Sequence, residues 1–204
     1  ERLLRPANWP SGAPGRGACV VEGPRGIRVG VIHLQGRVFM NASSDFFVEV
    51  DKQLEAMKQK TDVVVVDMHA EATSEKIALS WYLDGRVSFL FGTHTHVPTA
   101  DERILPGGTA FQCDVGMTGP HESILGRRID RVMQTTTTFE PTYFEVASDD
   151  VRIQTGDATL PLSGRAAVAY VDRMAGGDVK VGLTFLGLDG DGADRLRRFI
   201  RAPG

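Results

Sequence analysis

Three of the five histidines follow two apolar segments, in a pattern that is typical of metal ligands. Residues 63–66 are four valines that lead to His69, and the mostly apolar residues 87–91 lead to His94 and His96. A buried parallel strand delivers its last residues to the carboxyl edge of a sheet, where α/β proteins build their sites. The sequence therefore predicts metal ligation by these three histidines.

The spacing of His94 and His96 favours a site with two ions. In such a site the ions lie about 3.5–4 Å apart, and two histidines on one loop are able to serve one ion each. The alternative is that both bind backbone groups in a turn. Asp67 and Glu71 flank His69, where each could ligate a metal, orient an imidazole, form a salt bridge or begin a helix. The sequence leaves these roles open.

A glycine-rich loop, residues 116–119, lies further along the chain. Its backbone N–H groups could face a phosphate. The predicted substrate contacts are Gly116, Thr118 and His121. Asp101 and Asp114 are interpreted as turn caps, and His33, inside an apolar run, as a core residue.

A βαβ unit is expected to bring the histidines together. The pattern predicts a strand over 62–67, a helix over 74–84 that ends at Gly85, and a strand over 87–91. A strand, a helix and a second strand within about thirty residues form a βαβ unit, in which the two strands are parallel neighbours. His69 and His94 should therefore emerge at the same edge of the sheet.

Other segments show weaker patterns. A hairpin is predicted over 18–22 and 27–34, and a helix over 44–60 with Ser43 or Ser44 as its N-cap. The remaining predictions are short strands over 103–105 and 109–113, a helix over 129–138, strands over 143–147, 151–154, 166–171 and 179–185, and a helix over 192–201.

The composition is that of an ordinary globular protein. The 204 residues carry a formal net charge of -3, with 23 basic and 26 acidic side chains, so an extended nucleic-acid surface is not expected. The two cysteines favour a reducing, cytoplasmic location. No apolar run reaches the roughly 18 residues of a membrane span. The chain opens at Glu1, which suggests a fragment.

Several blocks of the sequence resemble the YmdB-like bacterial metallophosphoesterases, described as 2',3'-cyclic-nucleotide 2'-phosphodiesterases. The resemblance extends over about residues 3–147. The blocks that carry it are residues 5–8, 36–40, 67–76, 83–87, 92–97, 99–101, 104–110 and 114–120.

The resemblance implies an α/β fold, a metallophosphatase-type αββα sandwich that here lacks its N-terminal βα units. Residues 1–147 would be the C-terminal part of that domain, and 148–204 a β-rich tail with a terminal helix. It also implies two metal ions, iron with manganese or zinc as alternatives, and attack on phosphorus by metal-bound hydroxide.

Carried over from the family, His69 and His94 would bind one ion and His96 the other. The family's Asp, bridging Glu, two Asn and proton-donating His precede this region, so no catalytic residue is expected in this chain. The leading hypothesis is a hydrolase of cyclic nucleotides, a small-molecule substrate. The alternatives are a non-catalytic scaffold or a metallophosphatase of other specificity, and self-association is left open.

Overall fold

The computed structural model describes residues 3–22, 26–41 and 43–147, and the backbone of 151–152, 164–173 and 179–188. The chain divides into two compact units, residues 1–116 and 117–204. Each unit is described by itself.

The first unit contains a six-stranded sheet with the order β1-β2-β3-β4-β6-β5. Strands β2, β3, β4 and β6 run parallel, whereas β1 and β5 lie antiparallel at the two sides. The predicted α/β class and the parallel pairing of β3 with β4, the strand that His94 follows, are confirmed. The strands are β1 (Ala18–Glu22), β2 (Arg28–Gln35), β3 (Val63–His69), β4 (Phe89–Thr93), β5 (Arg103–Ile104) and β6 (Ala110–Gln112).

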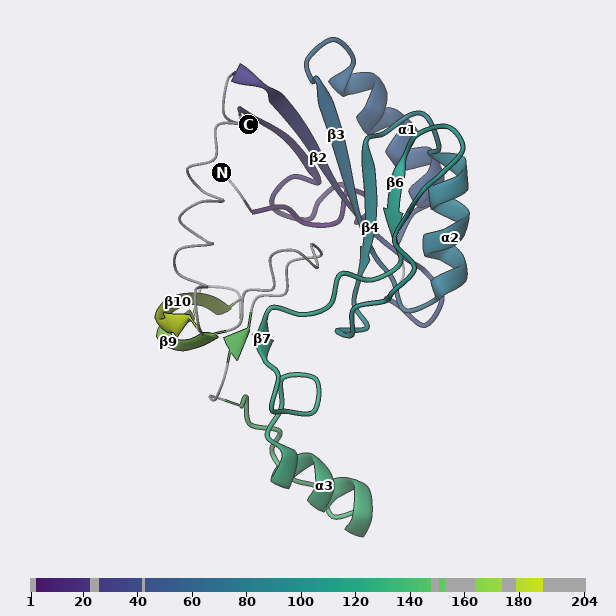
Figure 1. Ribbon diagram of the computed structural model, residues 1–204. Coiled ribbons are helices and arrows are strands. Elements are labelled where there is room, and N and C mark those ends of the chain that lie inside the picture. The colour runs from purple at the N-terminus through teal and green to yellow at the C-terminus, as the bar shows by residue number, and fades with distance from the viewer. Residues whose placement is uncertain are drawn as a thin grey trace. The chain divides into compact units, whose positions relative to one another are not determined.

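Two helices, α1 (Phe46–Met57) and α2 (Thr73–Tyr82), cover one face of this sheet (Figure 1). Alternate strand residues point to opposite faces, so Val66 and Met68 join the buried core. Burial of each such side chain stabilises the fold by roughly 1.5–3 kcal/mol. The intervening Asp67 and His69 lie on the other face and are half-buried.

The N-cap of α1 differs from the prediction. Asp45 caps the helix, because its carboxylate accepts hydrogen bonds from the backbone N–H groups of Phe47 and Val48 at 2.8 and 3.2 Å. The Ser44 hydroxyl instead donates to the carbonyl of Asn8. The prediction of a serine cap was therefore wrong, and the helix is shorter than 44–60.

Strands β3 and β4 extend further toward their carboxyl ends than predicted. β3 ends at His69 itself and β4 ends at Thr93, and these two residues are direct neighbours in the ladder. β4 begins two residues later than expected, at Phe89. The strand ends, and not the loops beyond them, therefore fix the position of His69.

The second unit contains α3 (Ile129–Thr138), which the sequence predicted. Strand β7 (Gly119–Pro120) pairs with β8 (Val151–Arg152), and β9 (Gly164–Arg173) pairs with β10 (Val179–Leu188), both antiparallel. The predicted strand over 143–147 was wrong, because this segment forms only an isolated bridge between Val146 and Arg127. The predicted helix over 192–201 lies outside the described residues.

The length and hydropathy of each helix show whether it could span a membrane, and both are known for the part of the chain that the structure describes. None of its helices is both long and apolar enough to cross a bilayer.

Candidate metal centre

His69 and His94 meet at the carboxyl edge of the sheet. His94 Nδ1 lies 3.1 Å from His69 Nε2, and the two rings are nearly perpendicular with their centroids 4.8 Å apart. The expectation that both histidines emerge at one edge is confirmed.

Each of these rings already has an oxygen beside its other nitrogen. His69 Nδ1 lies 3.0 Å from the Thr93 hydroxyl, and His94 Nε2 lies 3.1 Å from the Glu71 carboxylate. If both outer nitrogens carry the ring protons, the two nitrogens that face each other keep their lone pairs. Two such lone pairs repel unless a metal ion or a proton joins them.

The spacing of these nitrogens suits a shared ion. Two imidazole nitrogens at about 2.1 Å from one ion are about 3 Å apart when the angle between them at the ion is about 90°, as in an octahedral site. The 3.1 Å between His69 Nε2 and His94 Nδ1 matches this separation. The two histidines therefore fit one metal ion as a pair of ligands.

The environment of His69 lowers the pKa of its imidazole below the ordinary value. Burial is the largest cause, followed by the nearby His94, and the Asp67 carboxylate opposes the shift. A lowered pKa keeps the ring neutral at the pH of most cells, which is the state that binds a metal.

The loop that carries His94 and His96 has a strained backbone. Both residues have positive φ angles, 106° and 68°, which side chains with a Cβ rarely adopt. Such strain costs on the order of 1–3 kcal/mol per residue and persists only where the surroundings enforce it. Here the enforcing contact is made by Thr95, whose backbone N–H and hydroxyl both donate to Asp114 Oδ2, at 3.1 and 2.7 Å.

Asp114 is itself held by a buried ion pair. Lys76 Nζ lies 2.9 Å from Asp114 Oδ2, and the two side chains are 0% and 1% exposed. The backbone N–H of Gly116 donates to Asp114 Oδ1 at 2.8 Å. Burial raises the pKa of Asp114, but the hydrogen bonds from Lys76, Thr95 and Gly116 outweigh it and lower the pKa below the ordinary value.

The sequence prediction for Asp114 was incomplete. The residue does cap the turn at Gly116, but the ion pair with Lys76 was missed. The sequence did contain a signal for the burial of Lys76. This residue lies three residues before Leu79 and seven before Leu83, on the same side of the helix, and both leucines are fully buried.

Gly92 makes room for this arrangement. A Cβ at this position would lie 1.8 Å from the carbonyl oxygen of Cys113 and 2.6 Å from the side chain of Lys76. Only glycine allows the backbone of β4 to pass this close to residue 113.

The polar groups behind His69 form a chain along the same face of the sheet. The Thr93 hydroxyl donates to Asp67 Oδ1 at 2.8 Å, and His33 Nδ1 lies 2.8 Å from Asp67 Oδ2. His33, interpreted as a core residue from its sequence, is thus half-buried beside a carboxylate. The structure thus gives a contact to each acidic residue whose role the sequence left open. Asp67 accepts a hydrogen bond from the Thr93 hydroxyl, and Glu71 lies beside His94 Nε2.

The remaining predicted site residues are His96, Gly116, Thr118 and His121. His96 is exposed, and no three His, Cys, Asp or Glu side chains within the described ranges are grouped to hold a metal ion. Gly116 has a φ of 78° and packs against Pro98. Thr118, which is exposed, and His121, which is half-buried, belong to the second unit. The substrate and ligand roles of these residues stay predictions.

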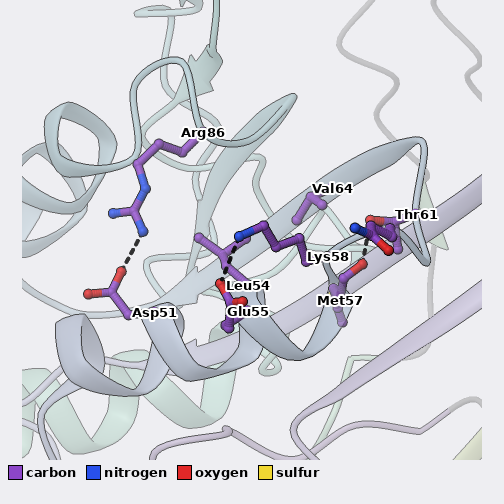
Figure 2. A pocket seen from close by; sticks show the side chains of 9 residues that line it. Asp51, Leu54, Glu55, Met57, Lys58, Thr61, Val64 and Arg86 are labelled. Atoms are coloured by element: carbon purple, nitrogen blue, oxygen red, sulfur yellow. Dashed lines mark hydrogen bonds and ion pairs between the residues drawn. The ribbon is translucent and has the colours of Figure 1, made fainter.

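A pocket of about 280 Å³ lies at the opposite, amino edge of the sheet (Figure 2). It is bordered by the end of α1 and the start of β3. Arg86 bonds Asp51 at 2.6 Å, and Lys58 lies 3.5 Å from Glu55. The charged groups here are paired with one another.

Comparison with known proteins assigns the chain to a family. A family model described as YmdB-like protein matches residues 1–163. The chain belongs to the YmdB-like family. This membership confirms the resemblance that the sequence blocks indicated.

One relative of this chain is the 2',3'-cyclic-nucleotide 2'-phosphodiesterase of Bacillus subtilis (strain 168). It is 49% identical over 145 residues, which are 71% of this chain and 54% of that protein. The chain therefore spans about half the length of this relative.

Two solved structures share the fold of this YmdB-like chain. A hypothetical protein from Thermus thermophilus matches with a TM-score of 0.69 and 37% identity, over 91% of this chain and 68% of that one. A protein from Mycoplasma pneumoniae described as a novel phosphatase matches with a TM-score of 0.65 and 27% identity, over 97% of this chain and 68% of that one. These likenesses support the metallophosphatase-type α/β class.

Proposed function

We propose that the chain carries the histidine ligands of a two-metal centre in a hydrolase of phosphoric diesters. The observation that carries the proposal is the 3.1 Å approach of His69 Nε2 and His94 Nδ1, with an oxygen beside the other nitrogen of each ring. Family membership and the name of the Bacillus subtilis relative support it.

Each side chain has a distinct task in this proposal. His69 and His94 hold one ion, and His96 contributes to the other. When bound, the ions supply an activated water and offset the charge of the phosphate. The buried pair of Lys76 and Asp114 keeps the strained loop of His94 in place.

The described residues contain no third ligand grouped with His69 and His94. The proposal therefore needs further ligands, and the family resemblance implies that these are an Asp, a bridging Glu and two Asn, together with a proton-donating His. Imidazole ligands suit iron, manganese and zinc alike.

The proposed substrate is a 2',3'-cyclic nucleotide. Gly116, Thr118 and His121 are the proposed substrate contacts, because a glycine-rich loop offers backbone N–H groups to a phosphate.

Substitution of His94 by alanine tests this function. In the protein at its natural length, H94A should lose bound metal, and its turnover of 2',3'-cyclic AMP should fall at least about 100-fold, beyond the 10–100-fold typical of losing a residue behind a ligand. Metal content by elemental analysis and initial rates are the measurements. Arg28→Ala, at the amino edge, is the control and should keep both. An H94A protein with full metal and full turnover would remove His94 from the site.

A phosphomonoesterase is a second candidate, because the Mycoplasma pneumoniae structure is described as a phosphatase. Parallel assays on 2',3'-cyclic AMP, 3',5'-cyclic AMP and an aryl phosphate separate the two functions. A folded protein that binds no metal and turns over none of the three substrates would instead favour a non-catalytic scaffold.

A further inference from the structure

Asp67 and Thr93 have no task in the proposed function, yet the sheet places them directly behind its ligand His69. In the parallel ladders, Thr93 lies opposite His69 and His33 lies opposite Asp67. The contacts form one line, from His33 Nδ1 to Asp67 Oδ2 at 2.8 Å, from Asp67 Oδ1 to the Thr93 hydroxyl at 2.8 Å, and on to His69 Nδ1 at 3.0 Å.

The direction of the hydrogen bonds that Thr93 makes with Asp67 and His69 determines which nitrogen of His69 carries the proton. A carboxylate only accepts, so the single proton of the Thr93 hydroxyl is donated to Asp67. The same hydroxyl oxygen must then accept from His69, which requires a proton on Nδ1. The lone pair is left on Nε2, the nitrogen that faces His94.

We propose that Asp67 and Thr93 are positioning residues that fix the Nδ1–H tautomer of His69 and so present its Nε2 lone pair to a divalent cation. Carboxylate groups behind metal-bound histidines have this effect in many proteins, and their loss typically costs 10–100-fold in metal affinity. The metal part of the inference rests on the proposed function, whereas the tautomer part does not.

A purely structural role for Thr93 makes the opposite prediction. The residue is β-branched and sits in a strand, where valine has the same shape and pairs equally well. If the hydroxyl only completed the local hydrogen bonding, Thr93→Val would alter stability and leave the chemistry of His69 unchanged. A readout on the imidazole itself therefore distinguishes the two roles.

The first measurement is the tautomer of His69 in the metal-free protein at its natural length, from long-range ¹H–¹⁵N spectra at pH 8. The wild type should show the proton on Nδ1, and T93V should lose this preference. Thr93→Ser keeps the hydroxyl and should restore it. Thr61→Val, at the other end of β3, is the matched control because its hydroxyl makes only a 3.4 Å contact to Met57.

The second measurement is Mn²⁺ affinity by calorimetry on the same proteins. T93V should bind Mn²⁺ about 10–100-fold more weakly, with wild-type affinity in T93S and T61V. Asp67→Asn, which removes the charged acceptor, should weaken binding as well.

A proton on Nε2 of His69 in the wild type, or wild-type Mn²⁺ affinity in both T93V and D67N, would overturn the inference. The wild-type spectrum needs no variant, so the test holds even if T93V does not fold. A wild type that binds no Mn²⁺ would instead defeat the proposed function, while the tautomer still decides whether the two residues fix His69.

Discussion

The two edges of the central sheet use charged and polar residues in opposite ways. At the carboxyl edge, two imidazole nitrogens face each other at 3.1 Å and need a cation or a proton between them. At the amino edge, which holds the pocket, Arg86 already faces Asp51 and Arg28 already faces Asp62. The charged groups at the pocket are therefore already paired, whereas the histidine pair can still bind a cation.

The two edges also differ in what holds their residues in place. The amino-edge pairs are exposed, and such pairs contribute about 0–1 kcal/mol. The carboxyl-edge loop has positive φ angles at His94 and His96, and it is held by Asp114, which is buried against Lys76. The comparison predicts that substitutions behind the histidine loop have large effects and that substitutions around the pocket have small ones.

Lys76→Met should have the largest effect on stability. It leaves the Asp114 carboxylate buried without its cation, and removing one partner of a buried pair costs roughly 3–5 kcal/mol. Urea unfolding measures this loss. The control is Lys58→Met at the pocket, where the partner Glu55 is exposed, and its free energy of unfolding should change by less than about 0.5 kcal/mol.

The same variant tests the strained loop. Without Lys76, Asp114 is less firmly placed to accept from Thr95, so metal binding should weaken together with stability. If K76M unfolded at the same urea concentration as the wild type, the buried pair would not be what supports the histidine loop.

Acid should weaken the support of the histidine loop that Asp114 provides. The pKa of Asp114 is lower in the folded protein than in the unfolded chain. Its contribution to stability is therefore fully present above the unfolded pKa of about 4, and it is lost as the pH falls through the lower folded pKa. The wild type should lose stability steeply below about pH 4.

Asp114→Asn provides the comparison. This variant should be less stable at pH 7, and its stability should depend less on pH below about 4, because one acid-sensitive carboxylate is gone. Urea unfolding at a series of pH values gives both slopes. Equal slopes for wild type and variant would mean that Asp114 is not a source of acid sensitivity.

The sequence predicted those parts of the site that depend on contacts between residues close together in the chain. It did not predict the parts that depend on distant residues. The β3-α2-β4 unit is local, so its periodicity placed His69 and His94 at one edge correctly. The ion pair of Lys76 and Asp114 joins residues 38 apart, and its formation depends on the register of β4 with β6. The helix spacing of Lys76 indicates that this side chain is buried, but it does not indicate which carboxylate becomes its partner once the sheet is assembled.

The same reason explains the other misses. The contact of His33 with Asp67 depends on the register of β2 with β3, which the sequence did not specify. The cap of α1 was misassigned because the Ser44 hydroxyl donates its hydrogen bond to the carbonyl of Asn8, which is distant in the sequence. Local patterns identified the elements, and long-range pairing decided the roles of individual polar side chains.

Arg86→Met, at the pocket, should have the smallest effect. Its partner Asp51 also accepts a hydrogen bond from the Tyr82 hydroxyl, so the carboxylate keeps a donor when the guanidinium is removed. Both charged groups are more than 40% exposed, and the expected loss is at most about 1 kcal/mol in urea unfolding. Metal content and turnover should stay at wild-type values, because every described contact of the histidine pair lies at the other edge. A fall in either one would show that the pocket acts on the histidine edge, and the contrast between the two edges would no longer hold.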